Sequence, residues 1–491
     1  MNIRVNHSIK TPIYMQIATQ MKNQILTGEI AAGSTLPSER SMAQILGVHR
    51  NTVVRAYSEL KDQELIDSRQ GVGYVVNLRE SEGGRGDAAR GKRIHWPSQI
   101  RAKYQDLEVT FDDLFQRFQE ENVISLGSGI AATEIYDTEK VAQDIAGLVT
   151  EEGRNQYFYS PYQGDANLRQ KLVSFLSTKG IKATMGEIQI LTETNQALDF
   201  IVTLLVNPGD VILMEEPVSP DVYRAMELAG GRIITVPVDM DGMQCDRLEE
   251  LILLYKPRFI YVNSSFHDPT GAILSMERRQ QIVEIAGRHR VVVIEDDAAS
   301  ELVYSGSKFV PMKAYDKLNN VIYIYSFSLT FMPGLSLAFV VGDKSLIRSL
   351  SYLVSVRMVA TDWLTQKLIA KYLDDGSYYQ VLERFRENYA LKQELICRKL
   401  DQMKLLGMEY ERPRGGVYIW CRLPEGIDSK DLVIKAHRRG VSVLPGYVFY
   451  PQKNGGRDHI RLNYSYESRE RILQGMDILK ETVKSELAHK K

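Results

Sequence analysis

The sequence contains few cysteines, and they are far apart. Cys245, Cys397 and Cys421 are the three among 491 residues, and none belongs to a CxxC pair. This usage supports neither a disulfide framework nor a zinc site, and it is typical of a reducing compartment. We therefore expect a cytoplasmic protein without a metal centre.

Long apolar runs are also missing. The longest, such as residues 200–206, are far shorter than the roughly 20 residues needed to span a bilayer. The first twelve residues contain no apolar core of the kind that a signal peptide requires. These absences argue against a membrane function.

Neither sign of charge is in excess. Lysine and arginine number 61, aspartate and glutamate 62, and the net charge is −1. The chain as a whole is therefore not a polybasic nucleic-acid binder, and any affinity for DNA must be confined to one region. Residues 1–77 carry a net charge of +2, so the N-terminal end is the positive one.

The length and an ordinary globular composition predict several domains. Within residues 78–93, twelve of sixteen residues are glycine or charged, which is typical of a flexible linker. We predict a DNA-binding domain (1–77), a linker (78–105) and a large domain (106–491), the last with a large lobe (about 156–370) and a small lobe (about 106–155 plus 371–491).

The N-terminal region has the pattern of helix, turn and helix. Apolar residues at four-residue steps predict a first helix over residues 12–28. Ser38 is the expected N-cap of a second helix, Gly47 ends it, and a third helix is expected from about His49 to Lys61. Two glycines, Gly71 and Gly73, then permit a tight turn between two short strands, which predicts a wing.

Polar residues cluster at the start of the third predicted helix. Arg50, Asn51, Thr52 and Arg55 are expected to face outward, because the apolar positions of the same helix face the core. Arginine can grip guanine edges or phosphates, asparagine can pair with adenine, and threonine can contact a thymine methyl. The alternative is a scaffold whose arginines form a solvated face.

The segments LPSER, LGVHRNTVVRAYSEL and QGVGYVV resemble the winged helix-turn-helix of the GntR family of bacterial regulators. The resemblance covers residues 10–76. It implies that Arg40, Arg50, Thr52 and Arg55 are the principal DNA contacts and that Gln70 and Gly71 reach the minor groove or backbone from the wing. The implied partner is a double-stranded DNA operator.

Apolar β-branched runs alternate with helical stretches after the linker. The runs at 211–215, 258–263, 291–297 and 321–326 predict βαβ units around a parallel sheet. A long helical pattern from about residue 377, followed by the strand patterns GGVYIWCRL and DHIRLNYSY, predicts a separate α+β lobe. The predicted fold class is thus multidomain, with an α+β N-terminal domain and a C-terminal α/β domain.

Several segments of this region resemble the fold-type-I aminotransferase domain of the MocR-type regulators, which join a GntR-like reader to a pyridoxal-phosphate-binding module. They include YSPYQGDANLR, MEEPVSPDVY, FHDPTG, IEDDAASELVY and SFSLTFMPGLSLAF. The resemblance covers roughly residues 120–475 and implies a homodimer. It also implies a set of effector-binding positions: Tyr159, Asp268, Asp296, Ser326 and Arg461.

The resemblance assigns a role to most of these residues. Asp296 matches the carboxylate beside the pyridine nitrogen, Ser326 a hydroxyl of the phosphate cup, and Arg461 the arginine that binds a substrate carboxylate. Tyr159 matches a tyrosine that reaches the phosphate of the neighbouring subunit. Two alternatives stay open, since Asp296 can also hydrogen-bond a loop at a strand end and Arg461 can be an ordinary salt-bridge residue.

Four positions depart from the family pattern. The Schiff-base lysine is replaced by Leu329, the phosphate-binding arginine by Ser336, and the glycine of the phosphate-binding turn by Glu193, while Ala298 ends the usual DxY triplet. A carboxylate about 4 Å from a phosphate would cost about 4 kcal/mol per charge pair at an effective dielectric near 20. We therefore predict that pyridoxal phosphate forms no Schiff base here.

These observations predict a DNA-binding transcription regulator rather than an enzyme. Its large domain would sense a small metabolite, such as an amino acid or an amine, or serve as a dimer scaffold. Two alternatives are a regulator that binds pyridoxal phosphate noncovalently and a residual aminotransferase.

Overall fold

The computed structural model describes residues 12–26, 33–63, 65–69, 73–77, 122–132, 134–152, 159–306 and 309–489, with residues 3, 5, 30 and 31. The predicted wing-tip contacts, Gln70 and Gly71, and the predicted linker lie outside the described residues. The chain forms two compact units, residues 1–108 and 109–491.

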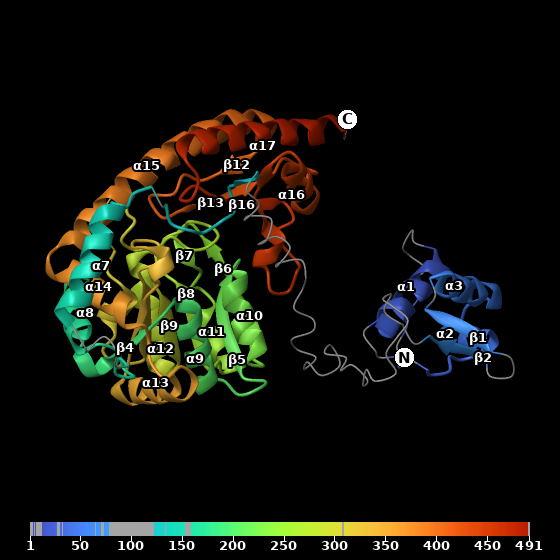
Figure 1. Cartoon of the computed structure of the whole chain (residues 1–491), viewed down its shortest axis with the longest axis horizontal. Helices are drawn as coiled ribbons and strands as arrows, with labels where there is room; N and C mark the ends of the chain where they lie inside the picture. Colours follow the sequence, from blue (N-terminus) through green and yellow to red (C-terminus); the bar gives the residue numbers. More distant parts are fainter. Residues whose placement is uncertain are drawn as a thin grey trace. The chain divides into compact units, whose positions relative to one another are not determined.

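The described residues of the first unit form three helices and a two-stranded antiparallel sheet (Figure 1). Its elements are α1 (Ile13–Leu26), α2 (Glu39–Leu46), α3 (Arg50–Asp62), β1 (Ile66–Arg69) and β2 (Gly73–Val76). The Ser38 side chain caps α2 by accepting a hydrogen bond from the Ser41 amide at 3.2 Å, and Gly47 ends the helix with a left-handed φ of 63°. Both residues act as the sequence predicts, because a hydroxyl satisfies a free amide and glycine tolerates positive φ.

The core of this unit lies between α1 and α3. Ile17 and Met21 of α1 and Val53, Tyr57 and Leu60 of α3 are fully buried. These are apolar positions of the predicted helix faces, so the opposite face of α3 is left to solvent. β1 and β2 pair from Ile66 with Val76 to Arg69 with Gly73 and form the strands of the predicted wing.

An eight-stranded sheet is the centre of the second unit. Its strand order is β4 (Ile188–Leu191), β11 (Ala338–Val341), β10 (Val321–Ser326), β9 (Val292–Asp296), β8 (Phe259–Asn263), β5 (Val211–Glu216), β6 (Arg232–Asp239) and β7 (Gly242–Met243). The strands from β10 to β6 are parallel to one another. The central strands are apolar on both faces because helices cover both sides of the sheet.

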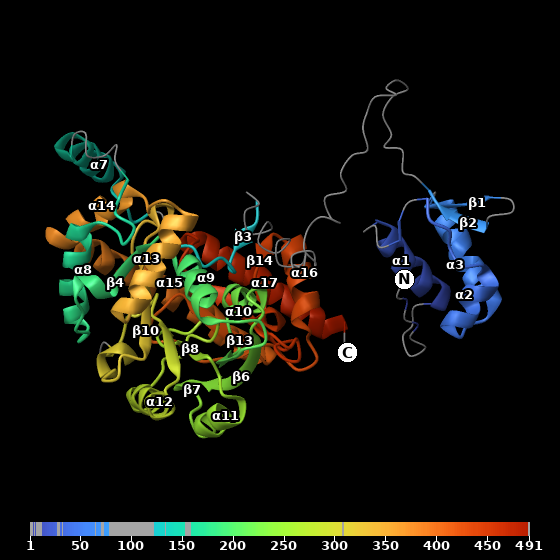
Figure 2. The same cartoon turned by 90° about the horizontal axis from the view of Figure 1, so that it is seen from below.

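Two layers of helices enclose the sheet (Figure 2). One layer contains α9 (Thr194–Leu205), α10 (Pro220–Leu228) and α13 (Lys344–Arg357). The other contains α11 (Leu248–Tyr255) and α12 (Met276–His289). The fold is therefore doubly wound, as the alternating pattern predicts.

The sheet is mixed, although the sequence predicts a parallel one. β11 is antiparallel to its neighbours β10 and β4. Residues 327–337 link β10 to β11, and a parallel connection needs a crossover of about a dozen residues or more, usually a helix. The short link contains only a 3₁₀ turn, so the chain reverses direction.

A smaller lobe follows the sheet. It begins with α15 (Ser377–Met403) and includes a four-stranded sheet of β12 (Glu409–Tyr410), β13 (Tyr418–Arg422), β16 (His459–Asn463) and β15 (Leu444–Pro445). Further elements are β3 (Ile124–Ser125), β14 (Val441–Ser442), α16 (Ser429–Arg438) and α17 (Arg469–His489). β3 pairs with β14, so residues before the large sheet belong with the C-terminal part of the chain.

The second unit also contains the outer helices α7 (Thr138–Glu152), α8 (Ala166–Thr178) and α14 (Trp363–Asp374). Within the described residues, no helix is both long enough and apolar enough to cross a membrane. The same residues contain no group of three or more histidine, cysteine, aspartate or glutamate side chains that could hold a metal ion.

Candidate functional site

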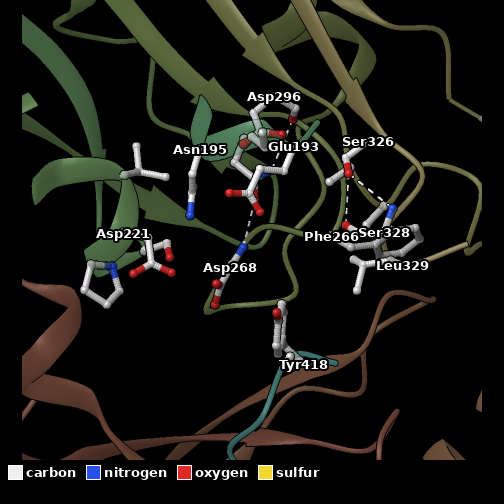
Figure 3. Close-up of a pocket in the computed structure, with 18 of the residues that line it drawn as sticks. Glu193, Asn195, Asp221, Phe266, Asp268, Asp296, Ser326, Ser328, Leu329 and Tyr418 are labelled. Atoms are coloured by element: carbon white, nitrogen blue, oxygen red, sulfur yellow. Dashed lines mark hydrogen bonds between the residues drawn. The ribbon is translucent and has the colours of Figure 1, made fainter. Parts of the chain in front are cut away.

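A cavity of about 350 Å³ lies at the carboxyl ends of the parallel strands. Asp296 ends β9 and Ser326 ends β10, and Asp268 follows β8. Because parallel strands present their carboxyl ends at one edge of a sheet, side chains from three strands meet there. Tyr418 of β13, labelled in Figure 3, and Arg461 of β16 come from the smaller lobe and line the same cavity.

Asp296 is the most deeply placed carboxylate of the cavity. The side-chain oxygen Oδ2 accepts a 2.8 Å hydrogen bond from the Tyr261 hydroxyl, whereas Oδ1 is buried without a hydrogen-bond partner. Burial raises the pKa of Asp296 to about 6; Asp297 and Asp268 add to the rise, and the Tyr261 hydroxyl and the Ala298 amide oppose it. A buried acceptor without a partner is unfavourable, so Oδ1 is suited to a donor from a bound molecule.

Ser326 lies on the opposite side of the cavity from Asp221 in Figure 3. The Ser328 hydroxyl lies 3.0 Å from its oxygen, and the Ser328 amide donates to the same oxygen at 3.2 Å. Leu329 and Ser336 also line the cavity. This wall therefore presents hydroxyls and an aliphatic side chain, and no cation.

Arg461 contacts a carboxylate of the same chain. Nη1 donates to Asp268 Oδ1 at 2.7 Å and Nη2 to the Gly127 carbonyl at 2.6 Å. The guanidinium also lies 4.3 Å from the centre of the Tyr418 ring, and Nε has no hydrogen-bond partner. Two sides of the arginine fork are thus engaged within the protein.

Two further carboxylates line the cavity. Glu193 is the N-cap residue of α9, but its side chain makes no capping hydrogen bond. Asp221 lies exposed in the first turn of α10; partial desolvation raises its pKa, with Asp268 adding to the rise and Arg461 and Arg224 opposing it. Figure 3 shows Glu193, Asp221 and Asp268 grouped on one side.

The cavity therefore brings together four of the five predicted effector-binding residues, namely Asp268, Asp296, Ser326 and Arg461. Tyr159 does not line it and is 81% exposed. Carboxylates outnumber cations in the lining, because four carboxylates and one guanidinium line the cavity.

Sequence reasoning missed several residues of this site. Tyr261 and Asn263 lie on β8, where the Asn263 side chain donates to the Asp296 carbonyl at 3.1 Å and accepts from the Asp268 amide at 2.8 Å. Asp221 follows the carboxyl end of β5. These residues could have been found from the sequence, because they are polar and lie at or just after predicted strands. Such positions lie at the ligand-binding edge of a parallel sheet.

The first unit presents the predicted reader residues at the start of α3. Arg50 and Asn51 are exposed and Thr52 is half-buried, while the His49 side chain caps the helix through the Asn51 amide. Arg50 donates to Glu39 at 2.9 Å, and Glu39 in turn accepts from the Tyr74 hydroxyl at 2.9 Å. The Arg50 hydrogen bond lowers the pKa of Glu39. These contacts link α2, α3 and β2.

Arg55 lies one turn further along α3. The guanidinium carbon lies 3.9 Å from the centre of the Tyr14 ring of α1, so the side chain is held by a cation–π contact while staying exposed. Arg40 is exposed in the first turn of α2. The exposed arginines thus come from both helices of the helix-turn-helix.

Two family models match the chain. The model described as "Bacterial regulatory proteins, gntR family" matches residues 13–76, and "Aminotransferase class I and II" matches residues 121–477. The chain is 29% identical to the uncharacterized HTH-type transcriptional regulator YdfD of Bacillus subtilis, over 95% of each chain. It is 25% identical to the probable rhizopine catabolism regulatory protein MocR of Rhizobium meliloti, over 88% of this chain and 86% of that one.

Aminotransferases match the large unit alone. The 2-aminoadipate transaminase of Thermus thermophilus is 30% identical over 77% of this chain and 94% of its own length. The crystal structure of the multiple substrate aminotransferase of Thermococcus profundus has a TM-score of 0.76 at 28% identity, covering 81% of this chain and all of that chain.

Proposed function

Because the chain belongs to the aminotransferase class I and II family and carries a GntR-family domain, we propose that it is a transcription regulator whose aminotransferase-like domain senses a metabolite without catalysing transamination. The regulatory part of this statement has direct support, since similarity to YdfD extends over both units. The loss of catalysis and the sensing role are inferred from the residues that line the cavity.

DNA binding is the property of the GntR-family domain. We assign the base and phosphate contacts to Arg40, Arg50, Asn51, Thr52 and Arg55, with Gln70 and Gly71 of the wing tip as further contacts. The exposure of the first turn of α3 supports this assignment, because residues at that end of a recognition helix reach base edges in the major groove.

One observation carries the absence of transaminase activity. Leu329 lines the cavity at the position of the family's Schiff-base lysine, and its side chain has no nucleophilic nitrogen. Transaminases of this family need that amine to hold the cofactor and move protons. We infer that the ancestral reaction is lost and that the cavity now serves binding alone.

The cavity does not fit pyridoxal phosphate. Glu193 stands at the N-terminus of α9, the end of a helix that otherwise attracts an anion, and Ser336 supplies no positive charge. The unpartnered Oδ1 of Asp296 would suit the protonated ring nitrogen of the cofactor. The phosphate end of the same molecule would meet a carboxylate.

We propose a cytoplasmic homodimer as the functional form. Two readers in one dimer would bind two half-sites, and a bound effector would change how the large domains hold them. The high exposure of Tyr159 supports a position near a neighbouring subunit rather than in the cavity of its own chain.

Selection of binding sites from random DNA duplexes with the full-length protein tests the regulatory function. We expect enrichment of a two-fold symmetric sequence with two half-sites. Failure to enrich any sequence would refute the role of α3 as a specific reader. Incubation with pyridoxal phosphate, amino donor and reductant tests for residual enzyme activity, and a reductively trapped cofactor or any keto-acid product would refute the loss of catalysis.

A further inference from the structure

We propose that the cavity of the large unit binds a cationic amine and rejects carboxylates and phosphates. This inference rests on the proposed function, because it names the chemical class of the effector. Four carboxylates line the cavity, from Glu193, Asp221, Asp268 and Asp296, against the single guanidinium of Arg461. Such a lining favours a ligand that carries positive charge.

The buried end of the cavity offers a vacant acceptor. Asp296 is 6% exposed, and its Oδ1 has no hydrogen-bond partner although Oδ2 is held by Tyr261. A protonated amine supplies an N–H donor and a compensating charge at the same time. Oδ1 of Asp296 is therefore the expected anchor of the ammonium group.

Arg461 does not make the cavity a carboxylate site. Its Nη1 and Nη2 are engaged by Asp268 and the Gly127 carbonyl. A ligand carboxylate would have to displace Asp268 or lie beside it, and like charges at close range repel. An uncharged acceptor on the ligand, such as a hydroxyl, could meet the free Nε of Arg461 without this cost.

The N-terminus of α9 is likewise closed to anions. Backbone amides at a helix start attract phosphates, but the negative charge of the Glu193 carboxylate, which lines the cavity at this point, repels them. On the other wall, Leu329 and Ser336 supply no positive charge. Compared with the family pattern, the cavity thus has a carboxylate at one position of the phosphate environment and neutral side chains at two others.

The remaining walls suit the hydrocarbon part of an amine. Tyr261, Phe266 and Tyr418 contribute aromatic rings to the lining, and the volume of about 350 Å³ is that of a small-ligand site. Arg224, which lowers the pKa of Asp221, lies on α10 but does not line the cavity. The acidic balance within the cavity is therefore preserved.

Titration calorimetry of the full-length protein tests this inference with compounds of one chain length. The probes are butylamine, 1,4-diaminobutane and 4-aminobutanoate, with pyridoxal phosphate and inorganic phosphate as anionic probes. We expect an amine to bind with a Kd below about 1 mM and at least about tenfold more tightly than 4-aminobutanoate. The two phosphate-bearing probes should give no heat of binding.

Two variants test the assigned residues. Glu193→Gln and Asp296→Asn remove one charge each with little change of shape, and each should weaken amine binding at least about tenfold. Glu481→Gln is the matched control, because Glu481 is an exposed carboxylate of α17 paired with Lys484. Since Glu193 is exposed, its variant keeps the test valid if Asp296→Asn fails to fold.

Three results would overturn the inference: no amine binds up to about 1 mM, 4-aminobutanoate or pyridoxal phosphate binds more tightly than the amines, or the Gln and Asn variants bind the amine as well as the control does. Failure of the proposed function would look different. An amine that binds without changing operator affinity would leave this inference intact and refute the sensing role. Intact operator binding without amine binding would refute this inference and leave the DNA-binding function intact.

Discussion

Arg461 and Asp268 form a 2.7 Å ion pair between two segments of the chain that are 193 residues apart in sequence. The resemblance to aminotransferases assigns Arg461 to the carboxylate of a substrate, yet a carboxylate of the protein already occupies one side of its guanidinium. Arg461 thus does form a salt bridge within the protein, as the alternative interpretation of this residue predicts. We therefore expect this pair to influence which ligands the cavity accepts.

Removing the charge of Asp268 should change the ligand preference of the cavity. In Asp268→Asn, Arg461 loses its anionic partner, so a ligand carboxylate can take that place. We expect 4-aminobutanoate to bind at least about tenfold more tightly than to the parent protein, or about 1.4 kcal/mol, while 1,4-diaminobutane binds less tightly. Calorimetry of both ligands measures the exchange.

Asp221→Asn is the control for that experiment. It also removes a carboxylate from the cavity but leaves the Arg461–Asp268 pair in place. It should weaken amine binding without a gain for 4-aminobutanoate. An equal gain in both variants would mean that overall charge, and not the release of Arg461, governs the preference.

The affinity for amines should fall in acid. The pKa of Asp296 is about 6, raised first by burial, whereas an alkylamine stays protonated far above neutral pH. Binding should therefore be constant above about pH 7 and weaken by about tenfold at pH 5, where Asp296 is mostly neutral. Calorimetry across this range checks the profile, and Asp296→Asn should bind weakly with no inflection near pH 6.

The same shift has a consequence for stability in the absence of ligand. Because the pKa of Asp296 is raised on folding, the folded state holds the proton more tightly than the unfolded state does. This residue therefore contributes stability below its unfolded pKa near 4, and the contribution is lost as the pH rises through about 6. Urea unfolding should show a smaller loss over this pH range for Asp296→Asn than for the parent protein. An identical loss in both would assign the pH dependence to other groups.

Placing a lysine at position 329 should allow pyridoxal phosphate to form a Schiff base, but with weak affinity. In Leu329→Lys, a lysine amine lies in the cavity, but Glu193 still repels the phosphate and Ser336 supplies no positive charge. Titration with pyridoxal phosphate should give a Schiff-base absorption band in this variant and none in the parent. Adding Glu193→Gly and Ser336→Arg should tighten binding at least about tenfold. A band in the parent protein would show that another lysine has taken over.

Patterns local in the sequence predicted the elements well. The structure has strands β5, β8, β9 and β10 at the runs 211–215, 258–263, 291–297 and 321–326. Ser38 caps the start of α2 and Gly47 its end, as expected. Such features depend on neighbouring residues, so the sequence carries them directly.

Contacts between segments distant in sequence were harder to predict. The acidic balance of the cavity arises because α9, α10, β8 and β9 bring four carboxylates together, and no spacing in the sequence shows this. The pairing of Arg461 with Asp268 depends in the same way on the contact between two lobes. β11 runs antiparallel to β10 because the link between them is short. The sequence shows the length of this link but not the path that its backbone takes.

Arg50 and Arg55 should each contribute to DNA binding. Arg50 donates to Glu39 and Arg55 is held by the Tyr14 ring, so both are positioned at the exposed side of α3. Replacing either by alanine should weaken binding to the selected operator by about 1 to 3 kcal/mol if it reads a base, with relaxed preference at that base pair. Tyr14→Leu should weaken binding less, by about 0.5 to 1 kcal/mol, because Arg55 keeps its charge but loses its support. Binding measured by fluorescence anisotropy on operator and scrambled duplexes separates the cases, since equal losses on both duplexes would identify a phosphate contact.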